Sequence, residues 1–359
     1  MPPLRKRLST RFAAVAAGTA LLAGAAAGCG SPDQDGEDSG STGRSGAVEK
    51  GAFPVTIAHK YGSTKISEEP ERIVTVGLTD QDAVLALGKV PVGTTEWLTS
   101  GYKGNIGPWA EDELGSAKPP AVLKDTGTGP QTEKIAALDP DVILALYAGL
   151  TKDQYRTLSK IAPVVVQPQG YNDYGLPWQQ QTETIGTALG QPAKARKLVA
   201  ATEKHISDAG AANPAFKGRT AVMATPYQGM FVFGPEDPRT RLLASLGFTQ
   251  PAGLKEVVGD EFGANISKER TDLVDTDALV WTVPDLKKDA AKLHANKLYN
   301  GLDVVEEGRE VFVQDGTPYG DAVSFVTVLS LPYTTDRLVP QLKAAVDGKP
   351  GTKVGGPES

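Results

Sequence analysis

Two stretches far apart in the chain follow the same order of residues. Each has a glutamate, an aspartate six residues later, a second aspartate two residues beyond it, and then an apolar run. The stretches are 133–144 and 269–280. Each is followed by a short apolar run that ends in glutamine, at 164–167 and at 311–314. Because several features recur in one order, the sequence indicates two similar lobes.

The alternation of short apolar runs and amphipathic segments predicts an α/β fold in each lobe. Residues 73–77 form an apolar run suited to a strand buried in a parallel sheet. We expect Asp80 to cap the helix that follows, Asp82 to be solvated near its start, and Gly88 to end it. The pattern therefore predicts two Rossmann-like lobes.

A long helical stretch separates the two lobes. Residues 177–212 have an apolar face, with an interruption at 190–192. One long backbone helix between two lobes would be a stiff connector. The predicted folded part comprises an N-terminal lobe, the connecting helix and a C-terminal lobe, at 53–176, 177–212 and 213–348. A disordered tail is expected at 349–359.

The first 28 residues have the pattern of a secretory signal peptide, with a basic start and an apolar segment too short to span a membrane. The run 26–29 resembles a lipobox, in which the cysteine becomes a lipidated N-terminus. The alternative is ordinary cleavage near 25–27, which would leave Cys29 as a free thiol. We expect lipidation of Cys29, a flexible polar linker over 29–52, and an extracytoplasmic position at the cell membrane.

Charge and composition exclude several functional classes. A formal net charge of −6 argues against a protein that binds duplex nucleic acid. A single cysteine excludes an internal disulfide and a thiolate metal cluster. The chain has no nucleophile elbow, phosphate-binding loop, dinucleotide glycine motif or paired histidines. We therefore expect no catalysis, cofactor or directly bound metal, and an enzyme on a two-lobed scaffold is the remote alternative.

Four passages resemble the substrate-binding proteins of ABC importers for iron-siderophores, haem and cobalamin. They are 59–66, 70–77, 133–143 and 329–340. The resemblance spans the whole folded part. It implies a class III substrate-binding protein, a monomer in which two α/β lobes are joined by one backbone helix and a ligand binds in the cleft between them.

The resemblance also implies a membrane partner. In this family a glutamate on each lobe docks into arginine pockets of the permease, and the matching positions are Glu133 and Glu269. Carboxylate–arginine contacts fix orientation and speed encounter. The alternative is that each acid only stabilises the first turn of a helix.

Aromatic and arginine side chains are expected to line the cleft, since a ferric siderophore presents apolar surfaces and chelating oxygens. Candidates that follow predicted strands are favoured because ligands of α/β sheets bind beyond the strands' carboxyl ends. For each aromatic the alternative is core packing, and Arg239 could instead pair only with Asp237 or Glu236. The predicted ligand residues are Trp97, Tyr147, Tyr227, Arg239, Trp281 and Tyr319.

The favoured cargo is a ferric siderophore of the hydroxamate type. Few basic residues occur among the cleft candidates, and ferric citrate or a tris-catecholate would call for more. Haem, cobalamin and iron citrate stay open as alternative ligands of the same fold.

Overall fold

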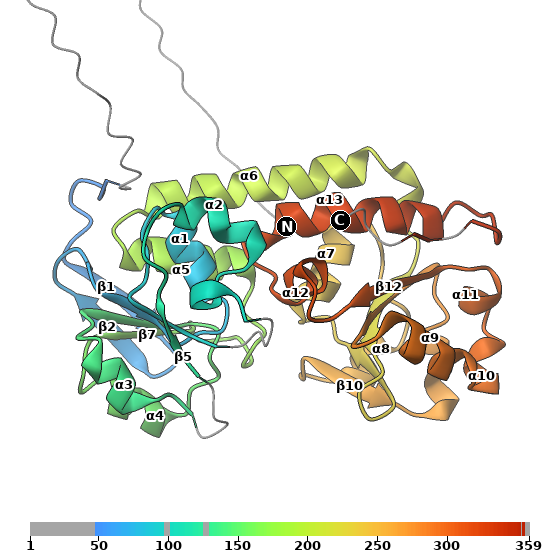
Figure 1. Cartoon of the computed structure of the whole chain (residues 1–359), viewed down its shortest axis with the longest axis horizontal. Coiled ribbons are helices and arrows are strands. Elements are labelled where there is room, and N and C mark those ends of the chain that lie inside the picture. The colour runs from blue at the N-terminus through green and yellow to red at the C-terminus, as the bar shows by residue number, and fades with distance from the viewer. Residues whose placement is uncertain (1–46, 97–100, 125–128, 353, 356–359) are drawn as a thin grey trace, which may run out of the picture. The chain divides into compact units, whose positions relative to one another are not determined.

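The computed structural model of the chain describes residues 47–96, 101–124, 129–352 and 354–355 (Figure 1). The predicted signal peptide, Cys29 and Trp97 lie outside these residues. Within them, no helix combines the length and the apolar character needed to cross a membrane.

The N-terminal lobe is built on a five-stranded sheet with the order β5-β4-β3-β6-β7. Every pairing in it is parallel. An antiparallel hairpin of β1 and β2 packs beside β7. The strands are β1 (Val55–His59), β2 (Gly62–Ile66), β3 (Ile73–Thr75), β4 (Gly93–Thr95), β5 (Ala121–Leu123), β6 (Val142–Ala145) and β7 (Val164–Val166).

The C-terminal lobe repeats this arrangement with the order β10-β9-β8-β11-β12. Strands β8, β11 and β12 are parallel, whereas β9 is antiparallel to both of its neighbours. The two α/β lobes, each with parallel strands at the centre of its sheet, confirm the predicted fold class. The strands are β8 (Ala221–Thr225), β9 (Met230–Phe233), β10 (Gly263–Ile266), β11 (Ala278–Val283) and β12 (Glu310–Gln314).

Helices flank both sheets. Those up to the connection between the lobes are α1 (Asp80–Ala86), α2 (Glu111–Leu114), α3 (Thr132–Ala137), α4 (Lys152–Leu158), α5 (Trp178–Ala188) and α6 (Pro192–Ala211). The second lobe has α7 (Pro238–Ser245), α8 (Leu254–Val258), α9 (Leu286–His294), α10 (Lys297–Asn300), α11 (Asp303–Glu306), α12 (Pro318–Ser324) and α13 (Ser330–Ala345). Short 3₁₀ turns are η1 (Lys103–Asn105), η2 (Pro108–Ala110), η3 (Pro214–Phe216) and η4 (Lys268–Leu273).

The stretch predicted as one interrupted helix, 177–212, forms two helices that pack against each other. Their contact is close, because a Cβ added to Gly186 would overlap that of Ala195. Pro192 cannot extend α5 since it lacks an N–H, and Gly190 takes a φ of 71° in the turn. The helix that runs along both lobes is therefore α6 alone, with α13 beside it (Figure 1).

The aspartates of the sequence repeat tie each sheet together. Asp141 Oδ2 accepts hydrogen bonds from the N–H groups of Glu71 (2.7 Å) and Arg72 (2.9 Å), just before β3. Asp277 Oδ2 accepts the N–H of Thr220 at 2.8 Å, just before β8. Each aspartate thus joins the start of one strand to the start of its parallel neighbour, which explains why the pattern occurs in both lobes.

The folded part extends beyond both predicted boundaries. Glu49, in the predicted flexible linker, accepts hydrogen bonds from the N–H groups of Ala193 (2.6 Å) and Lys194 (3.2 Å) in the first turn of α6. At the other end, Gln341 donates to the carbonyl oxygen of Gly355 at 2.8 Å, within the tail predicted to be disordered. The linker and the tail therefore both contribute residues to the folded part.

Candidate ligand-binding cleft

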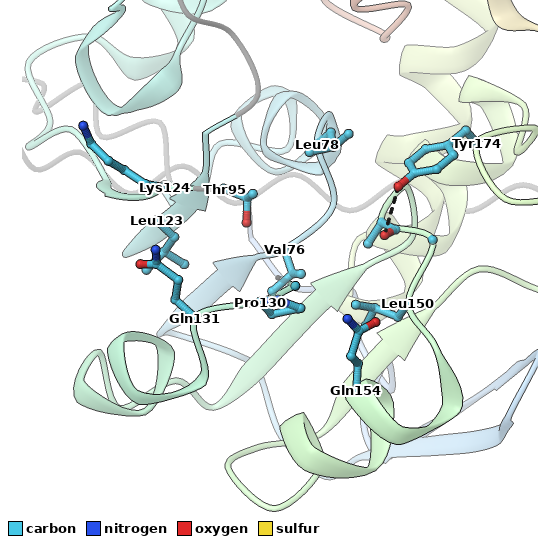
Figure 2. Close-up of a pocket in the computed structure, with 13 residues that line it drawn as sticks. Val76, Leu78, Thr95, Leu123, Lys124, Pro130, Gln131, Leu150, Gln154 and Tyr174 are labelled. Carbon is cyan, nitrogen blue, oxygen red and sulfur yellow. Dashed lines mark hydrogen bonds between the residues drawn. The ribbon is translucent and has the colours of Figure 1, made fainter. Parts of the chain in front are cut away.

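The N-terminal lobe has a cavity of about 240 Å³ at the carboxyl ends of β3, β4, β5 and β6, where ligands of parallel sheets bind. Among the described residues, its lining is a mixture of apolar and neutral polar side chains, and Lys124 is the single charged residue. Figure 2 shows the Lys124 side chain pointing away from the other lining residues. The described part of the lining therefore offers polar contacts without a strong charge.

Tyr147, a predicted ligand residue, follows β6 and packs against Tyr174. The ring centroids are 5.4 Å apart and the ring planes meet at 73°. The Tyr174 hydroxyl lies 3.4 Å from the carbonyl oxygen of Ala148 (Figure 2). Within the described residues the Tyr147 hydroxyl has no hydrogen-bond partner. Burial raises the pKa of Tyr147, so this hydroxyl is protonated at neutral pH and can donate to a ligand oxygen.

Arg239 lies in the first turn of α7 on the other lobe. Its Nε and Nη2 donate to the two carboxylate oxygens of Asp237, at 2.8 and 2.7 Å, and its Cζ lies 3.6 Å from the ring centroid of Phe233. Nη1 has no partner among the described residues. The guanidinium is thus held in one orientation with one edge available to a ligand.

Tyr147 and Arg239 lie within electrostatic reach of each other. Besides burial, the Asp237 carboxylate raises the pKa of Tyr147, and the Arg239 guanidinium lowers it. Arg241 joins the same two lobes, since its Nη1 donates to the carbonyl oxygen of Gly175 at 2.9 Å. The structure therefore places these two predicted ligand residues, which come from different lobes, within electrostatic reach of each other.

Two further hydrogen bonds join the lobes. The Tyr102 hydroxyl donates to Asp321 Oδ2 of α12 at 2.9 Å. The Asn172 side-chain amide donates to the carbonyl oxygen of Asp260 at 2.6 Å. In this conformation the lobes are therefore in direct contact around the candidate cleft.

Two of the predicted ligand residues are core residues instead. Trp281 has 0% of its surface exposed, and its Nε1 donates to the Tyr299 hydroxyl at 2.7 Å. The prediction was wrong because β11 continues to Val283 and Trp281 does not end the strand. Tyr319 is 6% exposed and donates to Gln341 Oε1 at 2.6 Å, because it lies in the first turn of α12 and not in a loop.

Tyr227 follows β8 as predicted and is 62% exposed, so its ring is accessible to a ligand. Its hydroxyl accepts a hydrogen bond from the neighbouring Gln228 amide at 3.3 Å. Trp97 lies outside the described residues. The ligand assignment of Tyr227 therefore stays a prediction.

Two buried carboxylates beside the cleft were not anticipated. Asp80 does not cap α1: it is fully buried and accepts hydrogen bonds from the N–H of Leu146 (2.8 Å) and from the Gln181 side chain (2.6 Å). Asp82, expected to be solvated, is also fully buried and joins the two lobes. Its Oδ2 accepts from the Trp109 indole at 2.7 Å and the Thr327 hydroxyl at 2.6 Å.

We expect the Asp82→Asn variant to gain stability relative to the native chain as pH rises. Burial raises the pKa of Asp82 to about 6, whereas the unfolded carboxyl titrates near 4, so the native state loses stability between those pH values as pH rises. Asparagine mimics the protonated acid and removes this loss. The unfolding free energy of Asp82→Asn relative to the native chain should increase by about 1.5 kcal/mol from pH 5 to pH 8.

Urea unfolding of both proteins at the two pH values measures this difference. The comparison isolates Asp82 from other titrating groups, including His59, whose pKa burial lowers and which acts in the opposite direction. A pH-independent difference would show that Asp82 does not titrate in this range.

Glu133 and Glu269 occupy equivalent places on the two lobes. Each lies in the first turn of the short helical element before a sheet strand, α3 before β6 and η4 before β11. Both are exposed. Ser267 makes no side-chain cap to η4. The placement leaves each carboxylate accessible to a partner.

Among the described residues, no three histidine, cysteine, aspartate or glutamate side chains are grouped as a metal site would require.

A family model described as periplasmic binding protein matches residues 73–315. The Fe(3+) dicitrate-binding periplasmic protein FecB of Escherichia coli is 28% identical over 213 residues, which cover 56% of this chain and 64% of that protein, slightly less than two thirds of its length.

Two solved structures share the fold along nearly their whole length. A periplasmic solute binding protein from Mycobacterium smegmatis is 32% identical, with a TM-score of 0.71, and the match covers 81% of this chain and 98% of that one. PiaA from Streptococcus pneumoniae in complex with ferrichrome is 28% identical, with a TM-score of 0.73 and coverage of 82% and 99%. The family model matches more than half of the chain, the two-lobed fold agrees with it, and the chain belongs to the periplasmic binding protein family.

Proposed function

We propose that this chain is the extracytoplasmic substrate-binding protein of an ABC importer and that it captures a ferric siderophore. The observation that carries the proposal is that the Tyr147 hydroxyl and the Arg239 guanidinium, from different lobes, lie within electrostatic reach of each other and both have donor capacity left. Hydroxyl and guanidinium donors suit the oxygens that surround a chelated ferric ion. Binding needs no chemical step on the ligand.

We favour a chelate of the hydroxamate type. PiaA, whose solved structure is a complex with ferrichrome, aligns over almost its full length. The cleft also offers few cations, since Arg239 is already paired with Asp237 and Lys124 points away from the cavity. Ferric citrate is the second candidate because the Escherichia coli relative is named for it. Haem and cobalamin are further candidates within the fold.

Export, anchoring and delivery complete the proposal. Cys29 would be lipidated and hold the protein at the outer face of the cell membrane, with the linker as a tether. The protein would act as a monomer. Glu133 and Glu269 would dock onto the permease subunits, and ATP hydrolysis by partner subunits would drive transfer.

Titration of tryptophan fluorescence tests ligand capture in a chain that begins after Cys29. We expect saturable quenching by a ferric hydroxamate at submicromolar concentration and none by the iron-free chelator. Arg239→Ala and Tyr147→Phe should each weaken binding about tenfold, because each removes a donor to the chelate. Arg156→Ala, an exposed change that breaks only a surface ion pair with Asp153, is the matched control.

The same titration with ferric citrate, a ferric catecholate, haemin and cobalamin distinguishes the alternatives. Quenching by haemin or cobalamin alone would keep the family and overturn the siderophore assignment.

A further inference from the structure

Asp315 directly follows β12, at the carboxyl end of a parallel strand of the second lobe. Its N–H donates to the carbonyl oxygen of Val283 at 2.9 Å, which fixes its backbone to the end of β11. The next residue, Gly316, donates to Asp321 Oδ1 at 3.1 Å. Since Asp321 also accepts from Tyr102 of the first lobe, Asp315 lies where the two lobes meet.

The charge of the Asp315 carboxylate is not neutralised by a direct partner among the described residues. Among the described residues it makes no hydrogen bond and no ion pair, and it is partly buried. Burial raises its pKa to about 6; Arg239 opposes this shift, and Asp321 and Asp289 add to it. At pH 7.5 the group is therefore an anion within electrostatic reach of Arg239.

The charges around Asp315 do not cancel it. Arg239 is bonded through two nitrogens to Asp237, so that pair is neutral as a unit. Arg241 is paired with Glu236 through one nitrogen, Nη2. Asp321 adds a second acid near Asp315. The charged groups that act on Asp315 thus leave its carboxylate uncompensated, and Lys124, in the described lining of the N-lobe cavity, points away.

We infer that Asp315 is a specificity-determining residue that makes the cleft prefer ferric hydroxamates bearing a protonated amine over neutral and anionic ferric chelates. The inference rests on the proposed function and names the charge class of its ligand. An ammonium group placed beside Asp315 gains an ion pair in a partly desolvated site, where the attraction exceeds that at an open surface. A ferric citrate complex, which is anionic, would meet repulsion from the same carboxylate.

Fluorescence titration with a matched pair of probes tests this at pH 7.5. The probes are ferrioxamine B, a ferric trihydroxamate with a free ammonium group, and its N-acetylated form, in which that charge is removed. The native chain should bind the amine form about tenfold more tightly than the acetylated form. Asp315→Asn should abolish this preference by weakening only the amine form, and should leave the affinity for the acetylated form unchanged.

Asp336→Asn is the matched control, because Asp336 is an exposed acid on α13 paired with His205. It should keep the native preference, although it removes the same net charge. Titration of the native chain in 0.5 M salt gives a measurement that needs no variant: affinity for the amine form should fall more than affinity for the acetylated form.

Equal affinities of the native chain for the two probes would overturn the inference while leaving siderophore capture intact. An equal loss of affinity for both probes in Asp315→Asn would also overturn the inference, because it would indicate a structural role for Asp315. Failure of both probes, ferrichrome and ferric citrate to bind the native chain would overturn the proposed function, and the inference with it.

Discussion

Replacement of Asp80 by alanine is expected to lower the free energy of unfolding by about 3–5 kcal/mol. The Asp80 carboxylate accepts hydrogen bonds from the N–H groups of Leu146 (2.8 Å) and Tyr147 (3.3 Å) and from the Gln181 side chain. Truncation would leave these buried donors unsatisfied and create a small cavity. Because Tyr147 is a proposed ligand residue, affinity for the ligand should fall as well.

Urea unfolding followed by far-UV circular dichroism measures this loss. Asp153→Ala, which removes an exposed carboxylate from α4, should change the unfolding free energy by less than about 0.5 kcal/mol. Gly77→Ala should mimic the loss at Asp80, since an added Cβ would overlap the Asp80 carboxylate. A native-like stability of Asp80→Ala would mean that water or a rearranged loop replaces these contacts.

Charge reversal at Glu133 and Glu269 together is expected to reduce import of the ferric ligand by more than about tenfold in cells. Each position lies on its own lobe in the first turn of an exposed helical element, so arginine there would repel an arginine pocket of the permease. Each single variant should retain part of the import, because the other contact persists. Ligand affinity measured by fluorescence should stay at the native value.

Glu68→Arg with Glu306→Arg forms the control pair, since both residues are exposed and again lie on different lobes. Import by this pair should match the native chain. If the control pair and the docking pair lose import equally, net charge and not docking explains the effect. Unchanged import by the docking pair would contradict the docking proposal.

The local pattern of the chain predicted the strands well because their apolar runs are short and bounded by turns. The repeat at Glu133 and Glu269 predicted two lobes with equivalent sheets, and Asp141 and Asp277 provide its physical cause. These features depend on residues that are close together in the chain and on one neighbouring parallel strand. They can therefore be recognised from the sequence.

Contacts between distant residues were harder to anticipate. Asp82 resembles any acid in the first turn of a helix, and its burial depends on Trp109 and on Thr327 of the other lobe. Trp281 was misplaced because the length of β11 depends on its parallel partner strands. For Arg239 the sequence left two roles open, ligand binding and an ion pair with Asp237 or Glu236. The structure shows the ion pair with Asp237.

The hydrogen bonds of Glu49 to the start of α6 determine where the chain can be shortened. The side chain of Gln191, which precedes α6, does not cap this helix. The carboxylate of Glu49, more than 100 positions earlier in the chain, caps it instead. A shortened chain that begins at Phe53, the predicted start of the N-terminal lobe, would lose this cap and about 1 kcal/mol of stability. Proteins trimmed for crystallisation or binding work should therefore begin at or before Ala47.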